Sequence, residues 1–104
     1  MPDRVEMLKS LLADDPNNTF ARYGLAMEYM KAGQLDTAAS EFRALIAADQ
    51  NYCAAYYHGA QALERMGDVE AAREMYQKGI EATMRTGDAH TRSEMQAALD
   101  LLPI

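Results

Sequence analysis

The chain has 104 residues, which suits one domain, and its 49% hydrophobic and 25% charged residues are typical of a folded globular protein. Its formal net charge of −6 repels phosphate backbones and anionic lipids, and its ten Lys and Arg residues are scattered, so nucleic acid is not an expected partner. The single cysteine, Cys53, excludes an internal disulfide and a multi-cysteine zinc site.

The N-terminal residues do not resemble a secretion signal, because Asp3 and Glu6 stand where such a signal is basic and then apolar. No apolar run reaches the roughly 18 residues of a membrane-spanning helix. We therefore expect a cytoplasmic protein that does not contact a membrane.

Apolar residues recur at helical spacing along almost the whole chain, and no segment alternates with period two, so we predict an all-α fold. The first helix is expected over residues 3–13, with Pro16 beyond its end, and the second over residues 18–32. Gly33 can close the second helix in the left-handed conformation.

The remaining helices are bounded by similar signals. Gly67 is placed to end the fourth helix as Gly33 ends the second, and Asp88 is a suitable N-cap for the last. These four helices are predicted over residues 35–48, 52–66, 69–85 and 89–102.

Two segments 34 residues apart, 25–42 and 59–76, share a pattern of small and aromatic residues. The paired positions are Ala26 and Ala60, Gly33 and Gly67, Ala38 and Ala72, and Phe42 and Tyr76. The alanines allow two antiparallel helices to approach closely, the glycine closes the turn, and the aromatic ring fills the space beyond the second alanine. Such a helix pair cannot bury its apolar face alone, so we expect it to stack on neighbouring pairs.

These positions resemble the tetratricopeptide repeat (TPR), a helix-turn-helix unit of about 34 residues. The first unit also matches at Leu25, Tyr29 and Asp49, whereas Arg22 and Leu63 depart from the pattern where aromatic residues are usual. The resemblance implies an α-α superhelix of about six antiparallel helices that forms one domain. It divides the chain into an N-terminal packing helix (1–18), two repeats (19–52 and 53–86) and a C-terminal capping helix (87–104).

In this family the first helices of successive pairs line a concave groove that binds peptides or segments of partner proteins. The resemblance therefore implies a protein-interaction module or scaffold, without enzymatic activity, metal or cofactor. By repeat phase, the positions expected to face the groove are Phe20, Tyr23, Gly24, Met27, Met30 and Lys31, then Ala54, Tyr57, His58, Gln61, Glu64 and Arg65, and finally Thr91, Arg92 and Met95.

The predicted groove has an apolar floor that suits a hydrophobic or aromatic side chain. The negative net charge favours a neutral or basic partner. Chaperone-binding members of the family hold a terminal carboxylate with Lys, Asn and Arg, but those positions here are different. The floor is predicted from Phe20, Tyr23, Met27, Tyr57 and Met95, and the carboxylate-holding positions are Tyr23, Met27, His58, Asp88 and Arg92.

Other interpretations of these residues remain open. Exposed stripes on the end helices could pair two copies in a structural homodimer, with the groove incidental or self-occupied. Cys53 could serve a small-ligand or redox role. The stripes are Val5, Leu8 and Leu12, and Leu99 and Leu102, while Tyr29, Phe42, Tyr56 and Tyr76 are expected in the core.

Candidate catalytic pairs are weak. On one helix, Cys53 and His58 lie about 140° apart around the axis, so they do not face each other. His90 and Glu94 can touch across one turn, but a third metal ligand is missing. No glycine-rich phosphate loop is present, and we expect no enzymatic activity.

Overall fold

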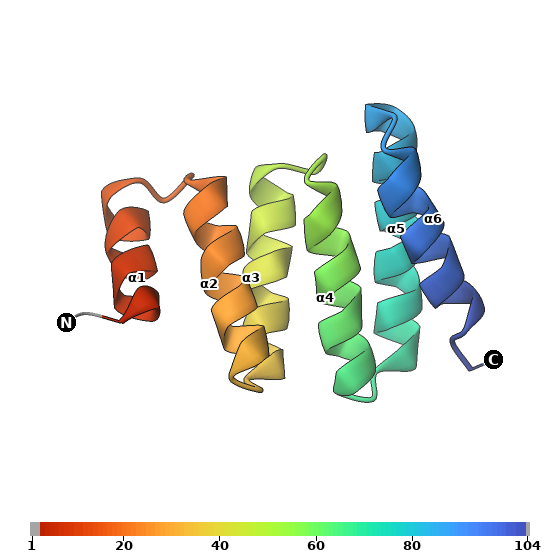
Figure 1. Ribbon diagram of the computed structural model, residues 1–104, viewed down its shortest axis with the longest axis horizontal. Coiled ribbons are helices and arrows are strands. Elements are labelled where there is room, and N and C mark those ends of the chain that lie inside the picture. Colours follow the sequence, from red (N-terminus) through yellow and green to blue (C-terminus); the bar gives the residue numbers. More distant parts are fainter. Residues whose placement is uncertain (1–2, 104) are drawn as a thin grey trace.

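The computed structural model describes residues 3–103, which form six helices and no strand, joined by short turns. The helices follow one another along the longest axis of the molecule, whose extents are 44 × 29 × 19 Å (Figure 1). They are α1 (Arg4–Asp14), α2 (Thr19–Lys31), α3 (Leu35–Ala48), α4 (Cys53–Arg65), α5 (Val69–Thr86) and α6 (Ala89–Asp100).

The prediction of an all-α fold with six helices is confirmed, and α3 has the expected bounds. The last helix differs most, because it ends at Asp100 instead of residue 102. There the backbone N–H groups of Leu101 and Leu102 donate to carbonyls three residues back, so the chain tightens into a turn before Pro103.

The helix ends follow the local sequence signals. Asp3, Asn18, Asp68 and Asp88 each accept a hydrogen bond from the backbone N–H three residues on, which satisfies a donor that the helix leaves free. In the turn between α2 and α3, Gly33 has a φ of 79°, a left-handed conformation that glycine adopts without strain.

The main hydrophobic cluster extends from α2 to α6 and is built on the residues that the repeat pattern singled out. Ala26, Ala38, Ala60 and Ala72 are all fully buried, as are Phe42 and Tyr76. The small side chains allow close helix packing, and the rings fill the space that results. The core role predicted for Phe42, Tyr56 and Tyr76 is therefore confirmed, whereas Tyr29 is only partly buried.

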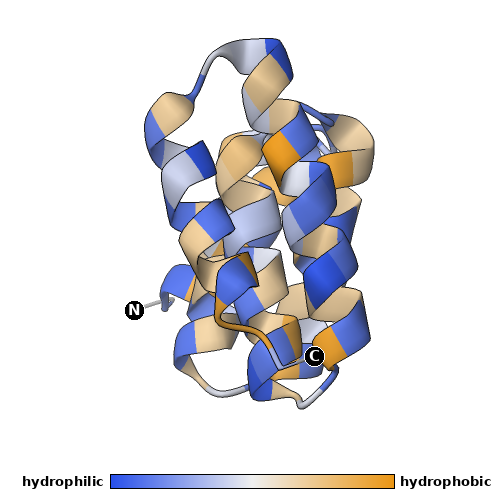
Figure 2. Ribbon diagram, turned by 90° about the vertical axis from the view of Figure 1, so that its right-hand side faces the viewer, coloured by the Kyte–Doolittle hydropathy of each residue, from blue (hydrophilic) through white to orange (hydrophobic). Residues whose placement is uncertain are grey.

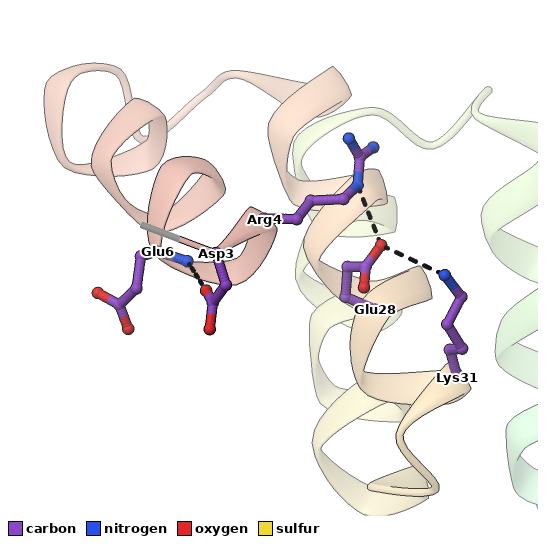
Figure 3. A network of polar contacts seen from close by, with 5 residues as sticks. All are labelled: Asp3, Arg4, Glu6, Glu28 and Lys31. Atoms are coloured by element: carbon purple, nitrogen blue, oxygen red, sulfur yellow. Dashed lines mark hydrogen bonds and ion pairs between the residues drawn. The ribbon is translucent and has the colours of Figure 1, made fainter. Parts of the chain in front are cut away.

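Helix α1 is held by a smaller cluster. Leu8 packs with Ala21 and Leu25 of α2, and Val5 and Leu12 pack against the same group. A polar link supports it: Arg4 Nε lies 3.0 Å from Glu28 Oε1, and Lys31 Nζ approaches the same oxygen from the next turn of α2 (Figure 3).

The apolar stripes proposed for pairing two copies pack against neighbouring helices of the same chain. Val5, Leu8 and Leu12 face α2, and Leu99 and Leu102 belong to the main cluster. Leu8 and Leu102 are buried, so these two were predicted wrongly as residues of a dimer contact, whereas Val5, Leu12 and Leu99 stay partly exposed. Among the described residues, no helix has the length and apolar character needed to cross a membrane.

Candidate functional site

The first helices of the pairs, α2, α4 and α6, share one face on which partly buried aromatic rings gather. The ring centroid of Tyr23 on α2 lies 5.4 Å from that of Tyr52, the N-cap of α4, and 5.9 Å from that of His58. The Tyr57 ring lies 5.3 Å from His58 on the same helix. We call Tyr23, Tyr52, Tyr57 and His58 the aromatic cluster.

His58 stands at the centre of this cluster. Its ring stacks on Phe42 of α3, and its Nδ1 lies 3.2 Å from Gln61 Oε1. Burial lowers the pKa of His58, and the hydrogen bond with Gln61 and the negative charge of Glu94 oppose this only in part. The imidazole is therefore mainly neutral at pH 7 and behaves as part of a weakly polar wall.

The phenols of Tyr23 and Tyr52 also stay neutral at pH 7. Burial raises the pKa of Tyr23 above its ordinary value, and the neighbouring Tyr52 raises it further. Burial likewise raises the pKa of Tyr52, with a smaller contribution from Asp49. Both hydroxyl groups can thus donate and accept hydrogen bonds beside an apolar surface.

A hollow lies at each end of α4 on either side of the aromatic cluster. The first has a volume of about 460 Å³ and lies where α4 and α6 begin; its wall includes Tyr52, Ala54 and Thr91. The second has a volume of about 280 Å³ and lies where α2 and α4 end. It is lined by Met30, Gln61, Glu64 and Arg65. The face therefore offers half-buried rings between two recesses.

Most of the residues predicted for the groove are accessible. Phe20 is the most exposed of the aromatic ones, at 70%. Lys31 is exposed, and its ammonium group approaches Glu28, which also pairs with Arg4 of α1 (Figure 3). Exposed or partly exposed are Phe20, Tyr23, Met27, Lys31, Ala54, Tyr57, His58, Gln61, Glu64, Arg65, Thr91 and Arg92.

Two of the predicted positions do not reach the surface. Met95 is fully buried and belongs to the main cluster, so placing it on the groove floor was wrong. Gly24 was also wrongly placed, because a side chain there would meet Leu8 of α1 at 3.2 Å. Met30 is 8% exposed, yet it lines one of the hollows.

The contacts of equivalent positions explain why Gly24 is covered. Gly24, His58 and Arg92 occupy equivalent positions in successive units, and each packs toward the helix before it: Gly24 toward Leu8, His58 toward Phe42, and Arg92 toward Met84. A residue at this position of the repeat thus points toward the preceding helix, and the size of its side chain decides whether part of it stays exposed to solvent.

Sequence reasoning missed Tyr52, and it named Glu94 only as a partner of His90. Tyr52 precedes α4 and was treated as the start of a helix, although an aromatic N-cap without a capping side-chain bond is a signal that the ring has another use. Glu94 acts on His58 across the face and also pairs with His90, whose Nε2 lies 3.1 Å away.

Comparison with known proteins identifies the family. A family model described as tetratricopeptide repeat matches residues 5–63, more than half of the chain, and a second with the same description matches residues 54–83. The chain belongs to the TPR family. The first match also includes most of α1, which supports the view that this helix continues the repeat pattern.

Relatives of this TPR protein come from several bacteria. A TPR repeat-containing protein of Pseudomonas aeruginosa is 28% identical over 95 residues, which cover 91% of this chain and 90% of that protein. The structure of a TPR domain protein from Salinibacter ruber is 34% identical, covers 82% of this chain and 86% of the other, and superposes with a TM-score of 0.76.

A more distant structure shares the fold alone. The type III secretion translocator chaperone of Yersinia enterocolitica is 16% identical to the TPR protein described here and superposes with a TM-score of 0.86. The alignment covers 92% of this chain and 67% of the chaperone. The helical stack is therefore compatible with very different sequences.

Proposed function

We propose that this TPR protein binds a segment of a partner protein along the face formed by α2, α4 and α6. TPR repeats support a general role in protein interaction, and no covalent chemistry is proposed. Among residues 3–103, no group of three or more His, Cys, Asp or Glu side chains could hold a metal ion.

The observation that carries the proposal is the aromatic cluster between two hollows. Half-buried rings offer a large contact area and lose little conformational freedom on binding, which is why tyrosine is common at binding hot spots. An apolar or aromatic side chain of the partner would lie on Tyr23, Tyr57 and His58, and the adjoining chain would extend into the hollows.

The charge of the molecule narrows the choice of partner. The chain carries a formal charge of −6, and Glu94 lies beside the central histidine. A neutral or basic segment would approach this face faster than an acidic one, and that advantage would decrease with added salt.

The test is affinity capture from a lysate of the organism that encodes the chain, with the intact protein and a Tyr23→Ala/Tyr57→Ala variant as baits. A Met7→Ala/Met66→Ala variant is the matched control, because both methionines are exposed outside the aromatic cluster. Circular dichroism first establishes that the variants fold.

We expect one partner to be retained by the intact chain and by the control but lost by the tyrosine variant. Equal retention by all three baits would contradict binding at the aromatic cluster. Recovery of the bait's own sequence alone would also contradict it and would favour the structural alternative.

That alternative, pairing of two copies, has one specific observation in its favour. On the outer side of α1, Met7 and Leu11 are 56% and 43% exposed and line a hollow with Glu6 and Ser10. Sedimentation equilibrium distinguishes the two functions, since pairing through α1 predicts a molecular mass that rises with concentration and falls again in Met7→Glu/Leu11→Glu.

A further inference from the structure

A fourth hollow lies on a different side of the molecule, between α3 and α5. Helix α3 packs on α2 and α4, and helix α5 packs on α4 and α6. Because α3 and α5 are not among the main contacting pairs, a recess remains between them. Its volume is about 230 Å³. Tyr56 of α4 lines it, and because successive residues turn by about 100° around a helix, Tyr56 and His58 face different sides of α4.

The floor of this recess is apolar. Ile46 and Ala47 come from α3, Ala71 and Met75 from α5, and Tyr56 closes the base. The recess owes its depth to the two alanines, since larger side chains there would fill it. Ligand pockets for drug-sized molecules occupy about 300 to 1,000 Å³, so this volume suits one large side chain better than such a molecule.

The rim of the recess, formed by Arg43, Lys78 and Glu74, has a net positive charge, whereas the whole chain is negative. Lys78 Nζ lies 2.9 Å from Glu74 Oε1, so the one carboxylate on the rim is already paired. The pKa of Glu74 is lowered first by this hydrogen bond and charge, and also by the positive charge of Arg43. Among the ion pairs of residues 3–103, none includes Arg43.

We propose that the recess between α3 and α5 is a second binding site, which takes one large apolar side chain of a partner segment while a neighbouring carboxylate of that segment pairs with Arg43. The floor provides the apolar contact, and the guanidinium of Arg43, which makes no ion pair among residues 3–103, provides the charge complementarity. This preference for an acidic segment is opposite to that of the α2, α4 and α6 face, so the two sites would bind different segments.

The test uses two blocked dipeptides as probes, acetyl-Phe-Glu-amide and acetyl-Phe-Lys-amide, and the methyl NMR signals of the chain labelled with ¹³C-methyl methionine. Met75 lines the recess, whereas Met27 and Met30 belong to the other face. We expect the Met75 signal to shift with the acidic probe, and the signals of Met27 and Met30 to stay in place.

The charge preference is tested by comparing the probes. The acidic probe should bind about fivefold more tightly than the basic one, as befits a partly exposed ion pair. In Arg43→Glu the preference should reverse. Arg43 is exposed, so this variant is expected to fold, and its circular dichroism spectrum provides the check.

The location is tested by filling the recess. Ala47→Phe should abolish the shift of Met75, while Ala44→Phe, on an exposed position of α3 outside the recess, should bind as the intact chain does. The proposal is overturned if Met75 does not shift at about 20 mM probe, a concentration that detects even very weak binding. It is also overturned if both phenylalanine variants bind equally.

Discussion

The two end helices each bury one side chain, yet they are attached to the molecule in different ways. Leu8 of α1 is 4% exposed and lies in a small cluster with Ala21 and Leu25 of α2. Met95 of α6 is fully buried and lies in the main cluster beside Gly79 and Tyr56, so it contacts two helices. Two helices with the same number of buried residues can therefore differ in how many neighbouring helices each buried side chain contacts.

This difference predicts different local stability. Helix α6 packs on both α5 and α4, whereas α1 packs mainly on α2. Figure 1 shows α1 at one end of the stack, and in Figure 2, which looks along the stack from the other end, α6 lies in front of the remaining helices. We expect α1 to open at a lower free energy than α6, because fewer buried contacts have to be broken.

The largest effect is expected for Met95→Ala. The substitution leaves a cavity in the main cluster and should lower the free energy of unfolding by about 3 kcal/mol. Urea denaturation measures this change. Met84→Ala, at a 64% exposed position of α5, is the control and should stay within about 0.5 kcal/mol of the intact chain. Similar losses of unfolding free energy in both variants would contradict this account of how α6 is held, since burial of Met95 would then add nothing to stability.

At the N-terminal helix, Leu8→Ala should lower the free energy of unfolding by about 2 kcal/mol, a small value for a buried leucine. Because Leu8 lies outside the main cluster, the effect should be local. Hydrogen exchange should become faster for the amides of α1, while those of α4 and α5 keep their protection. Equal acceleration throughout would show that α1 and the main cluster unfold together.

Substitutions of Gly79, which packs beside Met95, and of Gly24, which packs beside Leu8, should show a smaller difference between the two ends. A methyl group at Gly79 would lie 2.5 Å from Met95 Sδ and 2.6 Å from Tyr56 Cβ, so Gly79→Ala should destabilise by about 1 kcal/mol despite the better helix propensity of alanine. At Gly24 the nearest atom is a Leu8 methyl carbon at 3.2 Å, which can shift. Gly24→Ala should therefore change stability by about 0.5 kcal/mol or less, and thermal unfolding of both variants measures the contrast.

The smallest effect concerns pH. The pKa of His58 is lowered in the folded chain, chiefly by burial, so the unfolded chain takes up a proton first as the pH falls below the ordinary histidine pKa of 6.5. The stability that the neutral imidazole contributes is complete above that pH and is lost below it. The loss should be smaller in His58→Gln, measured by urea denaturation at pH 7.5 and 5.5. An identical loss in both proteins would exclude His58 as its source.

Much of the fold could be predicted from local residues. The turn glycines, the helix caps and the alanines at 34-residue spacing act through their own backbone or through the nearest helix, so they need no knowledge of the whole structure. The end of α6 was predicted too late because the apolar residues continue to Leu102, although Leu102 packs in a turn.

The candidate site could be predicted only in part. The repeat phase brought Tyr23, Tyr57 and His58 to one face, but it could not tell an open position from a covered one. Met95 and Met27 are equivalent in phase, yet Gly79 leaves room for Met95 to enter the core. The burial of Met95 depends on a residue of another helix, so the local sequence around Met95 could not predict it.

The single cysteine has a practical consequence. Cys53 begins α4, is 8% exposed, and its Sγ lies 3.4 Å from Thr86 Oγ1 at the end of α5. Cys53 also lines the hollow where α4 and α6 begin. The rate at which a thiol reagent alkylates the unmodified chain therefore reports on access to this hollow, and it can be measured during partner binding without an added label.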